Sequence, residues 1–189
     1  MADVVLLGIS GSLRRGSHNT GLLRAAAREL PEGVELRLYD GLRDLPAYDE
    51  DQDRGPPPPA VARLRAALGA ADGLLVATPE YNQSIPGQLK NAVDWASRPF
   101  PDNALRFLPA AVIGASTGAF GAVWAQAEMR KVLAAAGARV TEGELALGHA
   151  HERFDAEGHL VDHEAREQLG EVLALLVESV RIRGAAPVG

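Results

Sequence analysis

The sequence has no cysteine among its 189 residues, which excludes disulfide bonds, thiolate catalysis and metal sites built on cysteine. It has no apolar run of about 18 residues, the length that a membrane-spanning helix needs, so we expect no membrane partner. The first residues lack the basic region and the cleavage site of a signal peptide, and we therefore expect a cytoplasmic location. The net charge of −6 is unfavourable for binding a phosphate backbone, so we expect no nucleic-acid partner.

What the chain does contain is the composition of a globular protein. Apolar residues make up 47% of it and charged residues 23%, and both fractions are ordinary for a soluble fold. A chain of 189 residues is long enough for one sizeable core. We expect a single domain over residues 1–189, with a structured core over about residues 4–181 and a frayed tail from about residue 185.

Apolar runs and helical segments alternate along the chain. Strands are predicted at residues 4–9, 34–39, 74–77, 110–115 and 139–147, and helices at about 21–30, 60–71, 86–95, 122–136 and from 162 onward. The last strand contains Gly143, where an interruption is expected. Repetition of strand and helix predicts a three-layer, doubly wound α/β fold with right-handed crossovers. The expected sheet has five parallel strands in the flavodoxin-like order 2-1-3-4-5, with ligands at their carboxyl ends.

The first strand is followed by a turn rich in glycine, serine and arginine, residues 10–20. Glycines allow close approach of the backbone, a helix start carries partial positive charge, and Arg14 or Arg15 adds a full charge, so the turn has the parts of an anion site. It lacks the Walker lysine and the Gly-x-Gly-x-x-Gly pattern, and a phosphate monoester therefore fits it better than a pyrophosphate or ATP. The alternative is a capped turn with solvated arginines.

Two more turns of small and polar residues follow the third and fourth strands, at residues 78–86 and 116–121. Pro79 and Pro86 fix φ angles in the first of them, and Tyr81 offers an aromatic wall. Any one of these turns is as readily an ordinary connection. Because all three follow strands of a parallel sheet, we expect them to converge on one edge, where a flat ring carrying a phosphate would fit.

Three further features have simpler interpretations. His149 and His151 follow the last strand, but a metal site needs a third ligand and none stands out, so we expect a surface loop and no metal. The long connection at residues 41–59 is expected to be functional or mobile. Trp95 lies on the apolar face of its helix and is expected to belong to the core rather than to contact a cofactor.

The motifs resemble those of the NADPH-dependent FMN reductase family, in the branch that includes bacterial chromate and quinone reductases. The resemblance covers nearly the whole chain, from Val4 to Arg181. It is carried by Gly11-Ser12-Leu13-Arg14 with Ser17 and Asn19, by Pro79-Glu80-Tyr81-Asn82 with Ser84, Pro86-Gly87 and Lys90-Asn91-Ala92-Val93-Asp94-Trp95, by Ser116-Thr117-Gly118 with Gly121, and by Leu45-Pro46, Tyr48 and Asp51. The middle motif is the most specific, because many characteristic residues match without a gap.

The resemblance implies cofactors, an activity and an assembly. Members bind FMN noncovalently, take hydride from NADPH or NADH, and pass electrons to small-molecule acceptors, namely quinones, azo compounds, chromate or free flavin. They form homodimers or homotetramers, with each FMN near the subunit interface. By the same analogy the helices after the third and fourth strands would form the interface, with Asp94, Trp95, Trp124 and Arg130 at or near it.

The resemblance also assigns FMN contacts by position. The phosphate would be held by Ser12, Arg14, Ser17, Asn19 and Thr20, with His18 either at the phosphate or turned to solvent. The ring and its ribityl end would be lined by Pro79, Glu80, Tyr81 and Asn82, with Ser84 in the same loop, and the other side closed by Ser116, Thr117, Gly118 and Gly121. No catalytic acid or base is expected, because hydride transfer belongs to the flavin. Glu80 is the tempting candidate, but orienting the loop is its more ordinary role.

Three alternatives belong to different functional classes. One is an FMN reductase that supplies reduced flavin to a partner monooxygenase. Another is a non-enzymatic, flavodoxin-like electron carrier, which normally has a Thr/Ser-rich first turn and aromatic residues flanking the ring, whereas this first turn has two arginines. The third is a flavin-binding regulatory protein.

Overall fold

The computed structural model of the protein describes residues 2–185, and the expected tail at 186–189 lies outside them. Its strands are β1 (Val4–Ser10), β2 (Val34–Tyr39), β3 (Gly73–Thr78), β4 (Pro109–Ala115), β5 (Arg139–Val140) and β6 (Ala146–Leu147). They form one parallel sheet in the order β2-β1-β3-β4-β5, and β6 also pairs with β4. The predicted order is confirmed. The predicted fifth strand is split into β5 and β6 on either side of Gly143, which gives six strands instead of five.

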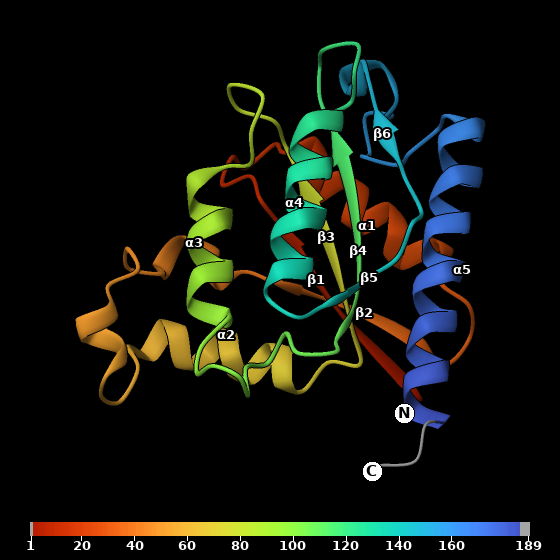
Figure 1. Cartoon of the computed structure of the whole chain (residues 1–189). Coiled ribbons are helices and arrows are strands. Elements are labelled where there is room, and N and C mark those ends of the chain that lie inside the picture. Colours follow the sequence, from red (N-terminus) through yellow and green to blue (C-terminus); the bar gives the residue numbers. More distant parts are fainter. Residues whose placement is uncertain (1, 186–189) are drawn as a thin grey trace.

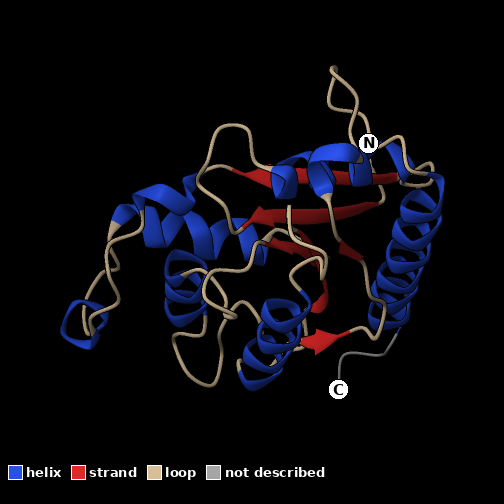
Figure 2. Cartoon of the chain, turned by 90° about the horizontal axis from the view of Figure 1, so that it is seen from above, coloured by secondary structure: helices blue, strands red, loops and turns tan. Residues whose placement is uncertain are grey.

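Helices cover both faces of this sheet and complete the three layers (Figure 1, Figure 2). On one face lie α2 (Pro59–Gly69), α3 (Gly87–Ala96) and α4 (Val123–Ala135), and on the other α1 (His18–Glu29) and α5 (His163–Ala185). Each face has its own apolar cluster, because successive strand residues such as Leu6 and Leu7 point to opposite sides. Strands β3 and β4 are buried along their whole length, which explains why they read as continuous apolar runs.

Helix α1 begins three residues earlier than the sequence predicts. Ser17 is its N-cap, and its hydroxyl oxygen accepts a hydrogen bond from the amide of Thr20 at 3.3 Å. The predicted start near Gly21 was too late, because glycine and the polar residues before it were read as part of the turn. His18, Asn19 and Thr20 therefore lie in the first turn of the helix, at the carboxyl end of β1.

The connection at residues 41–58 contains two short 3-10 helices, η1 (Gly41–Asp44) and η2 (Glu50–Asp53), and is bound to α3. The Asn91 amide donates to the Pro46 carbonyl at 2.8 Å and accepts from the Tyr48 amide at 2.7 Å. The Trp95 indole also donates to Pro46, at 2.9 Å. Trp95 is 0% exposed, so its expected place in the core is confirmed and it does not itself lie on a subunit surface.

Among residues 2–185, no helix combines the length and the apolar character that crossing a membrane requires.

Candidate functional site

The turns after β1, β3 and β4 meet at one edge of the sheet, at the upper end of Figure 1. The Gly11 amide donates to the carbonyl of Ala77 in β3 at 2.8 Å. A Cβ atom on Gly11 would lie 2.8 Å from the Leu89 side chain and 3.1 Å from Pro79, so this close approach requires glycine. The first turn is thereby held against the start of the second.

Asn19 ties the first turn to the end of β4. Its side-chain amide donates to the Ala115 carbonyl at 2.9 Å and accepts from the Ala115 amide at 3.0 Å, and the residue is buried. Thr20 adds a second tie, since its hydroxyl donates to the Ser10 hydroxyl at 2.9 Å. The side chains of Asn19 and Thr20 therefore support the first turn through hydrogen bonds to the ends of β4 and β1.

The exposed part of the first turn carries the positive charge. Arg14 and Arg15 are both exposed, and a Cβ atom on Gly16 would lie 3.4 Å from Nη1 of Arg14. The Arg14 guanidinium therefore folds back over the turn. The Ser12 hydroxyl accepts from the Arg14 amide at 3.4 Å, and the first turn of α1 has no acidic residue. A helix start with no acidic residue in its own first turn, beside an arginine, suits an anion.

The turn after β3 is a two-residue hairpin. Tyr81 and Ser84 exchange backbone hydrogen bonds of 3.0 and 3.1 Å, and Asn82 and Gln83 between them have φ angles of 55° and 60°. Tyr81 is 52% exposed and stands at the rim. The Glu80 carboxylate accepts from two backbone amides at the start of α4, at 3.1 Å each.

The turn after β4 is shaped by its glycines. The Ser116 hydroxyl accepts from the Gly118 amide at 3.1 Å, and Thr117 and Gly118 are exposed. Gly121 has a φ of 57°, and a Cβ atom there would lie 2.2 Å from the backbone of Ala146 in β6. Gly121 therefore lets the turn pack against β6, while the residues before it remain accessible.

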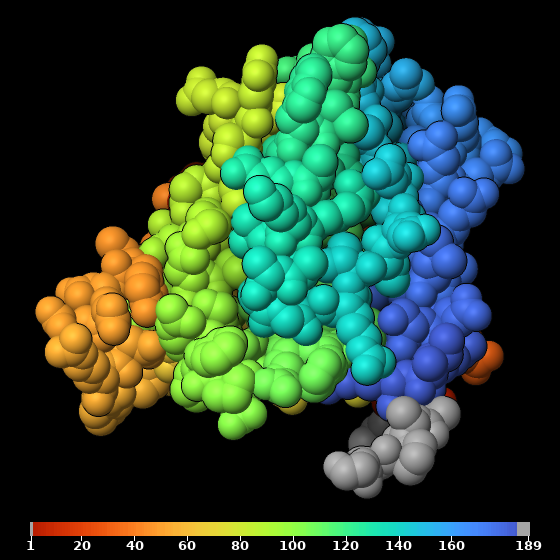
Figure 3. All heavy atoms as spheres, in the orientation of Figure 1, coloured from red at the N-terminus to blue at the C-terminus, as the bar shows by residue number. Residues whose placement is uncertain are grey.

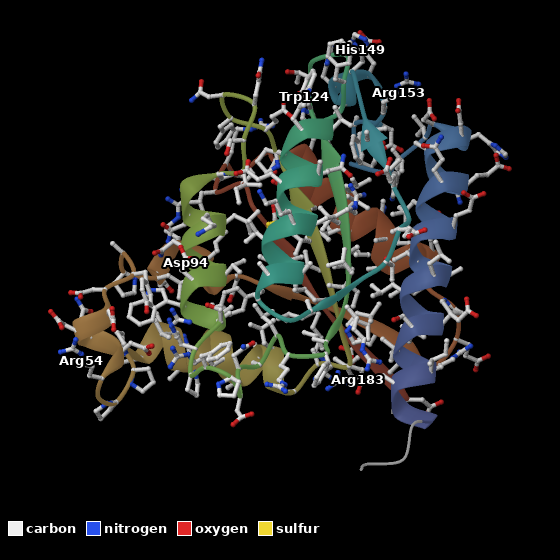
Figure 4. All side chains as sticks on the ribbon, viewed as in Figure 1. Arg54, Asp94, Trp124, His149, Arg153 and Arg183 are labelled. Atoms are coloured by element: carbon white, nitrogen blue, oxygen red, sulfur yellow. The ribbon has the colours of Figure 1, made fainter. Side chains whose placement is uncertain are left out.

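A fourth segment completes this edge, and the sequence did not predict it. The amides of His149 and Ala150 donate to the carbonyls of Gly118 and Ser116, each at 3.0 Å. Ala150 begins a short 3-10 helix, η3 (Ala150–Glu152). The expected surface position of His149 and His151 is confirmed, since both are exposed, with ring centroids 6.5 Å apart. Figure 4 shows His149 at the same end of the molecule as Trp124.

His18 joins this fourth segment to the first turn. Its ring stacks on Phe154 at a centroid distance of 5.9 Å, and Phe154 also covers Gly21. Burial, followed by the positive charges of Arg14 and His151, lowers the pKa of His18 below its ordinary value of 6.5. The neutral form of His18 is therefore favoured in the folded protein.

Two exposed aromatic residues at the rim were also missed as site residues. Phe120 is 66% exposed and Trp124 is 46% exposed, and their rings pack edge to face at 5.1 Å. Figure 3 shows the hairpin tip and the turn that bears Phe120 as two projections at the same end of the molecule. One signal for this pair is visible in the sequence, which is that Phe120 is aromatic in a turn of otherwise small residues.

The predicted site is an open edge. A surface cavity of about 530 Å³ lies elsewhere, around Arg98, Phe100 and Arg106 at the far ends of α3 and α4, and its lining shares no residue with the predicted contacts. At the edge itself, an exposed arginine, a helix start and glycine-permitted close approach fit a phosphate monoester with an attached flat ring.

The strand order and this edge define the chain as a flavodoxin-like α/β protein. The model of a family described as NADPH-dependent FMN reductase matches residues 4–152, and the chain belongs to that family. The predicted activity, an FMN-dependent oxidoreductase that uses NAD(P)H, is thereby confirmed at the level of the family.

Individual relatives agree over nearly the full length. An NAD(P)H-dependent FMN reductase of Pseudomonas aeruginosa is 45% identical over 184 residues, 96% of this chain and 98% of that protein. A 2-hydroxy-1,4-benzoquinone reductase of a Burkholderia species is 40% identical over 162 residues, 85% of this chain and 87% of the other. The structure of the flavoenzyme NAD(P)H:(acceptor) oxidoreductase FerB of Paracoccus denitrificans superposes with a TM-score of 0.86, at 33% identity, covering 95% and 98% of the two chains.

Proposed function

We propose that the chain passes electrons from NADPH or NADH through one bound FMN to quinones or related small acceptors, which include azo compounds, chromate and free flavin. The FMN phosphate lies at the first turn, and the ring lies between the turns after β3 and β4. The observation that carries this proposal is the exposed Arg14 beside the start of α1, at the edge where all three turns meet.

The roles of the side chains follow from their environments. Arg14, Ser12 and the first amides of α1 bind the phosphate, with His18 beside them. Tyr81 and Asn82 present the hairpin to one side of the ring, and the residues before Gly121 close the other side. FMN, when bound, supplies hydride acceptance and electron transfer. The protein's own part is to orient the ring and to exclude water, and no side chain is assigned as acid or base.

Absorbance of the purified protein and chromatography of its heat-released cofactor test the assignment. We expect one FMN per chain, because the first turn suits a single phosphate and not the pyrophosphate of FAD. Recovery of FAD, or failure to bind added FMN, contradicts it.

Steady-state assays separate the alternatives. Oxidation of NADPH that depends on added quinone supports the enzyme and contradicts a simple carrier or a regulatory protein. An enzyme with tight FMN keeps it through gel filtration. Free FMN that behaves as a saturable substrate favours instead a reductase that supplies a monooxygenase.

A homodimer or homotetramer is part of this proposal. Trp124 and Phe120 are exposed beside the site, and a second subunit placed there would cover both and enclose the flavin. Light scattering at micromolar concentration should give at least a dimer mass, and an active monomer of 19.9 kDa contradicts the assembly. Cytoplasmic location stays a prediction, which cell fractionation tests.

A further inference from the structure

Helix α4 has no capping side chain of its own. Its N-cap is Ala122, in a left-handed conformation with φ 63° and ψ 34°, and no side-chain hydrogen bond caps it there. The first amides of a helix need acceptors. The amides of Trp124 and Ala125 find theirs in one carboxylate oxygen of Glu80, at 3.1 Å each. A loop residue 44 positions earlier therefore caps this helix.

A second carboxylate makes the reverse connection. Glu128, in the second turn of α4, accepts from the Ser84 hydroxyl at 2.7 Å and from the Ile85 amide at 3.3 Å. Both bonds are partly buried, and hydrogen bonds to a carboxylate are stronger than those between neutral groups. Glu80, in the loop, thus accepts hydrogen bonds from α4, and Glu128, in α4, accepts hydrogen bonds from the loop.

Between these two anchors lies the hairpin tip. Asn82 and Gln83 both have positive φ angles, as a type I′ turn requires. The second position of this turn normally favours glycine, so Gln83 is strained. Strained residues persist where the surrounding structure fixes them, and they gather at ligand sites. The backbone bonds between Tyr81 and Ser84 close this tip, and the two carboxylates hold the residues on either side of it to α4.

We propose that Glu80 and Glu128 are positioning residues that clamp the hairpin 81–84 to α4 and that Glu80 lowers the reduction potential of the bound flavin. The proposal rests on the proposed function, because it places the ring between this hairpin and the turn that enters α4. The start of α4 carries partial positive charge, which would favour the negative charge of reduced flavin. The Glu80 carboxylate offsets that charge.

Glu80→Gln separates charge from clamping. Its amide oxygen can still accept from Trp124 and Ala125, but the negative charge is gone. Reduced FMN should then bind about tenfold more tightly relative to oxidised FMN, which raises the two-electron potential by about 30 mV. A dye-equilibration redox titration measures this shift. Glu171→Gln, an exposed change of the same type on α5, is the matched control and should leave the potential unchanged.

The clamp itself is tested without any flavin. Glu80→Ala removes both acceptor bonds, so acrylamide should quench Trp124 in the apoprotein more strongly, while Trp95 stays buried and Glu80→Gln stays near the parent value. Ser84→Ala removes the Glu128 bond to the hydroxyl and should speed proteolysis at the hairpin tip. Each variant is compared with Glu171→Gln.

The possible results are distinct. A raised potential in Glu80→Gln with greater quenching in Glu80→Ala supports the proposal. An unchanged potential in Glu80→Gln, or quenching and proteolysis equal to the parent in Glu80→Ala and Ser84→Ala, overturns it. Failure of the parent protein to bind FMN overturns the proposed function instead, and the apoprotein measurements still decide whether the clamp exists.

Discussion

The turn after β1 and the polar face of α3 are equally conspicuous in the sequence, but their side chains have different surroundings. Arg14 and Arg15 are exposed, at the edge where the turns meet. On α3, the Gln88 amide donates to the carbonyls of Leu42 and Leu45 at 2.7 and 3.1 Å. Asn91 and Trp95 bind the same connection.

This difference separates a region that is available to bind a ligand from a region that supports the fold. A polar motif whose donors are bonded inside the protein stabilises the fold, and one whose donors face solvent is available to a ligand. The α3 motif therefore fixes residues 41–48 against the helix, and the first turn presents exposed arginines at the edge where the turns meet. Substitutions in the α3 motif should lower stability and leave FMN affinity nearly unchanged. Substitutions in the first turn should lower FMN affinity and leave stability nearly unchanged.

The largest effect is expected from Trp95→Ala. It deletes a fully buried side chain that also donates to Pro46, so the free energy of unfolding should fall by about 3–5 kcal/mol. Urea titration followed by circular dichroism measures it. Trp124→Ala is the control, because the half-exposed Trp124 should change the unfolding free energy by less than about 1 kcal/mol. Equal losses in the two variants contradict the assignment of Trp95 to the core.

Arg14→Ala should weaken FMN binding without affecting the fold. Loss of a charge-assisted bond to a phosphate dianion costs about 1.5–3 kcal/mol, which is about a ten- to hundredfold increase in the dissociation constant. Quenching of flavin fluorescence measures it, and turnover at saturating FMN should largely recover. Arg15→Ala is the control and should bind FMN like the parent, because we assign the phosphate contact to Arg14, whose Nη1 lies 3.4 Å from the place of a Cβ atom on Gly16. Equal losses of FMN affinity in the two variants would contradict the assignment of the phosphate contact to Arg14.

Asn91→Ala tests whether the α3 motif supports the fold without taking part in FMN binding. It removes two hydrogen bonds that hold Pro46 and Tyr48, so unfolding should become easier by about 1–3 kcal/mol. FMN affinity at low temperature should stay within about twofold of the parent, a change below 0.5 kcal/mol. A loss of affinity without a loss of stability would place Asn91 in the binding region.

The smallest effect concerns His18 and pH. Its folded pKa lies below 6.5, so the unfolded chain binds the proton more readily. The stability contribution of His18 is complete above pH 6.5 and is lost as pH falls through the folded pKa. In the absence of FMN, His18→Gln should lose less stability than the parent between pH 8 and pH 5.5, measured by urea midpoints. An equal loss of stability in His18→Gln and in the parent would contradict this assignment.

The sequence predicted the strand order and the edge of the site, because both follow from local patterns. Continuous apolar runs identify buried parallel strands, and small polar residues after each strand identify the turns. The order of the strands then brings the turns together. The resemblance to a reductase family rested on the same turns.

The remaining features depend on contacts between distant segments. The binding of Glu80 to α4 joins positions 44 residues apart, and no periodicity signals it. His151 contributes to the lowered pKa of His18, and its segment is held to the turn after β4 by the amides of His149 and Ala150. The interruption of the last strand at Gly143 was expected, but the early start of α1 at His18 was an error of boundary, because the capping by Ser17 decides single residues.

The most direct test of the central claim compares the binding of FMN and riboflavin, which differ only in the phosphate, to the parent protein. If the first turn holds the phosphate through at least two charge-assisted bonds of about 1.5–3 kcal/mol each, FMN should bind more than about a hundredfold more tightly than riboflavin. Arg14→Ala should reduce that preference about tenfold or more. Equal affinities for FMN and riboflavin in the parent protein would contradict the assignment of the turn after β1 as the phosphate site.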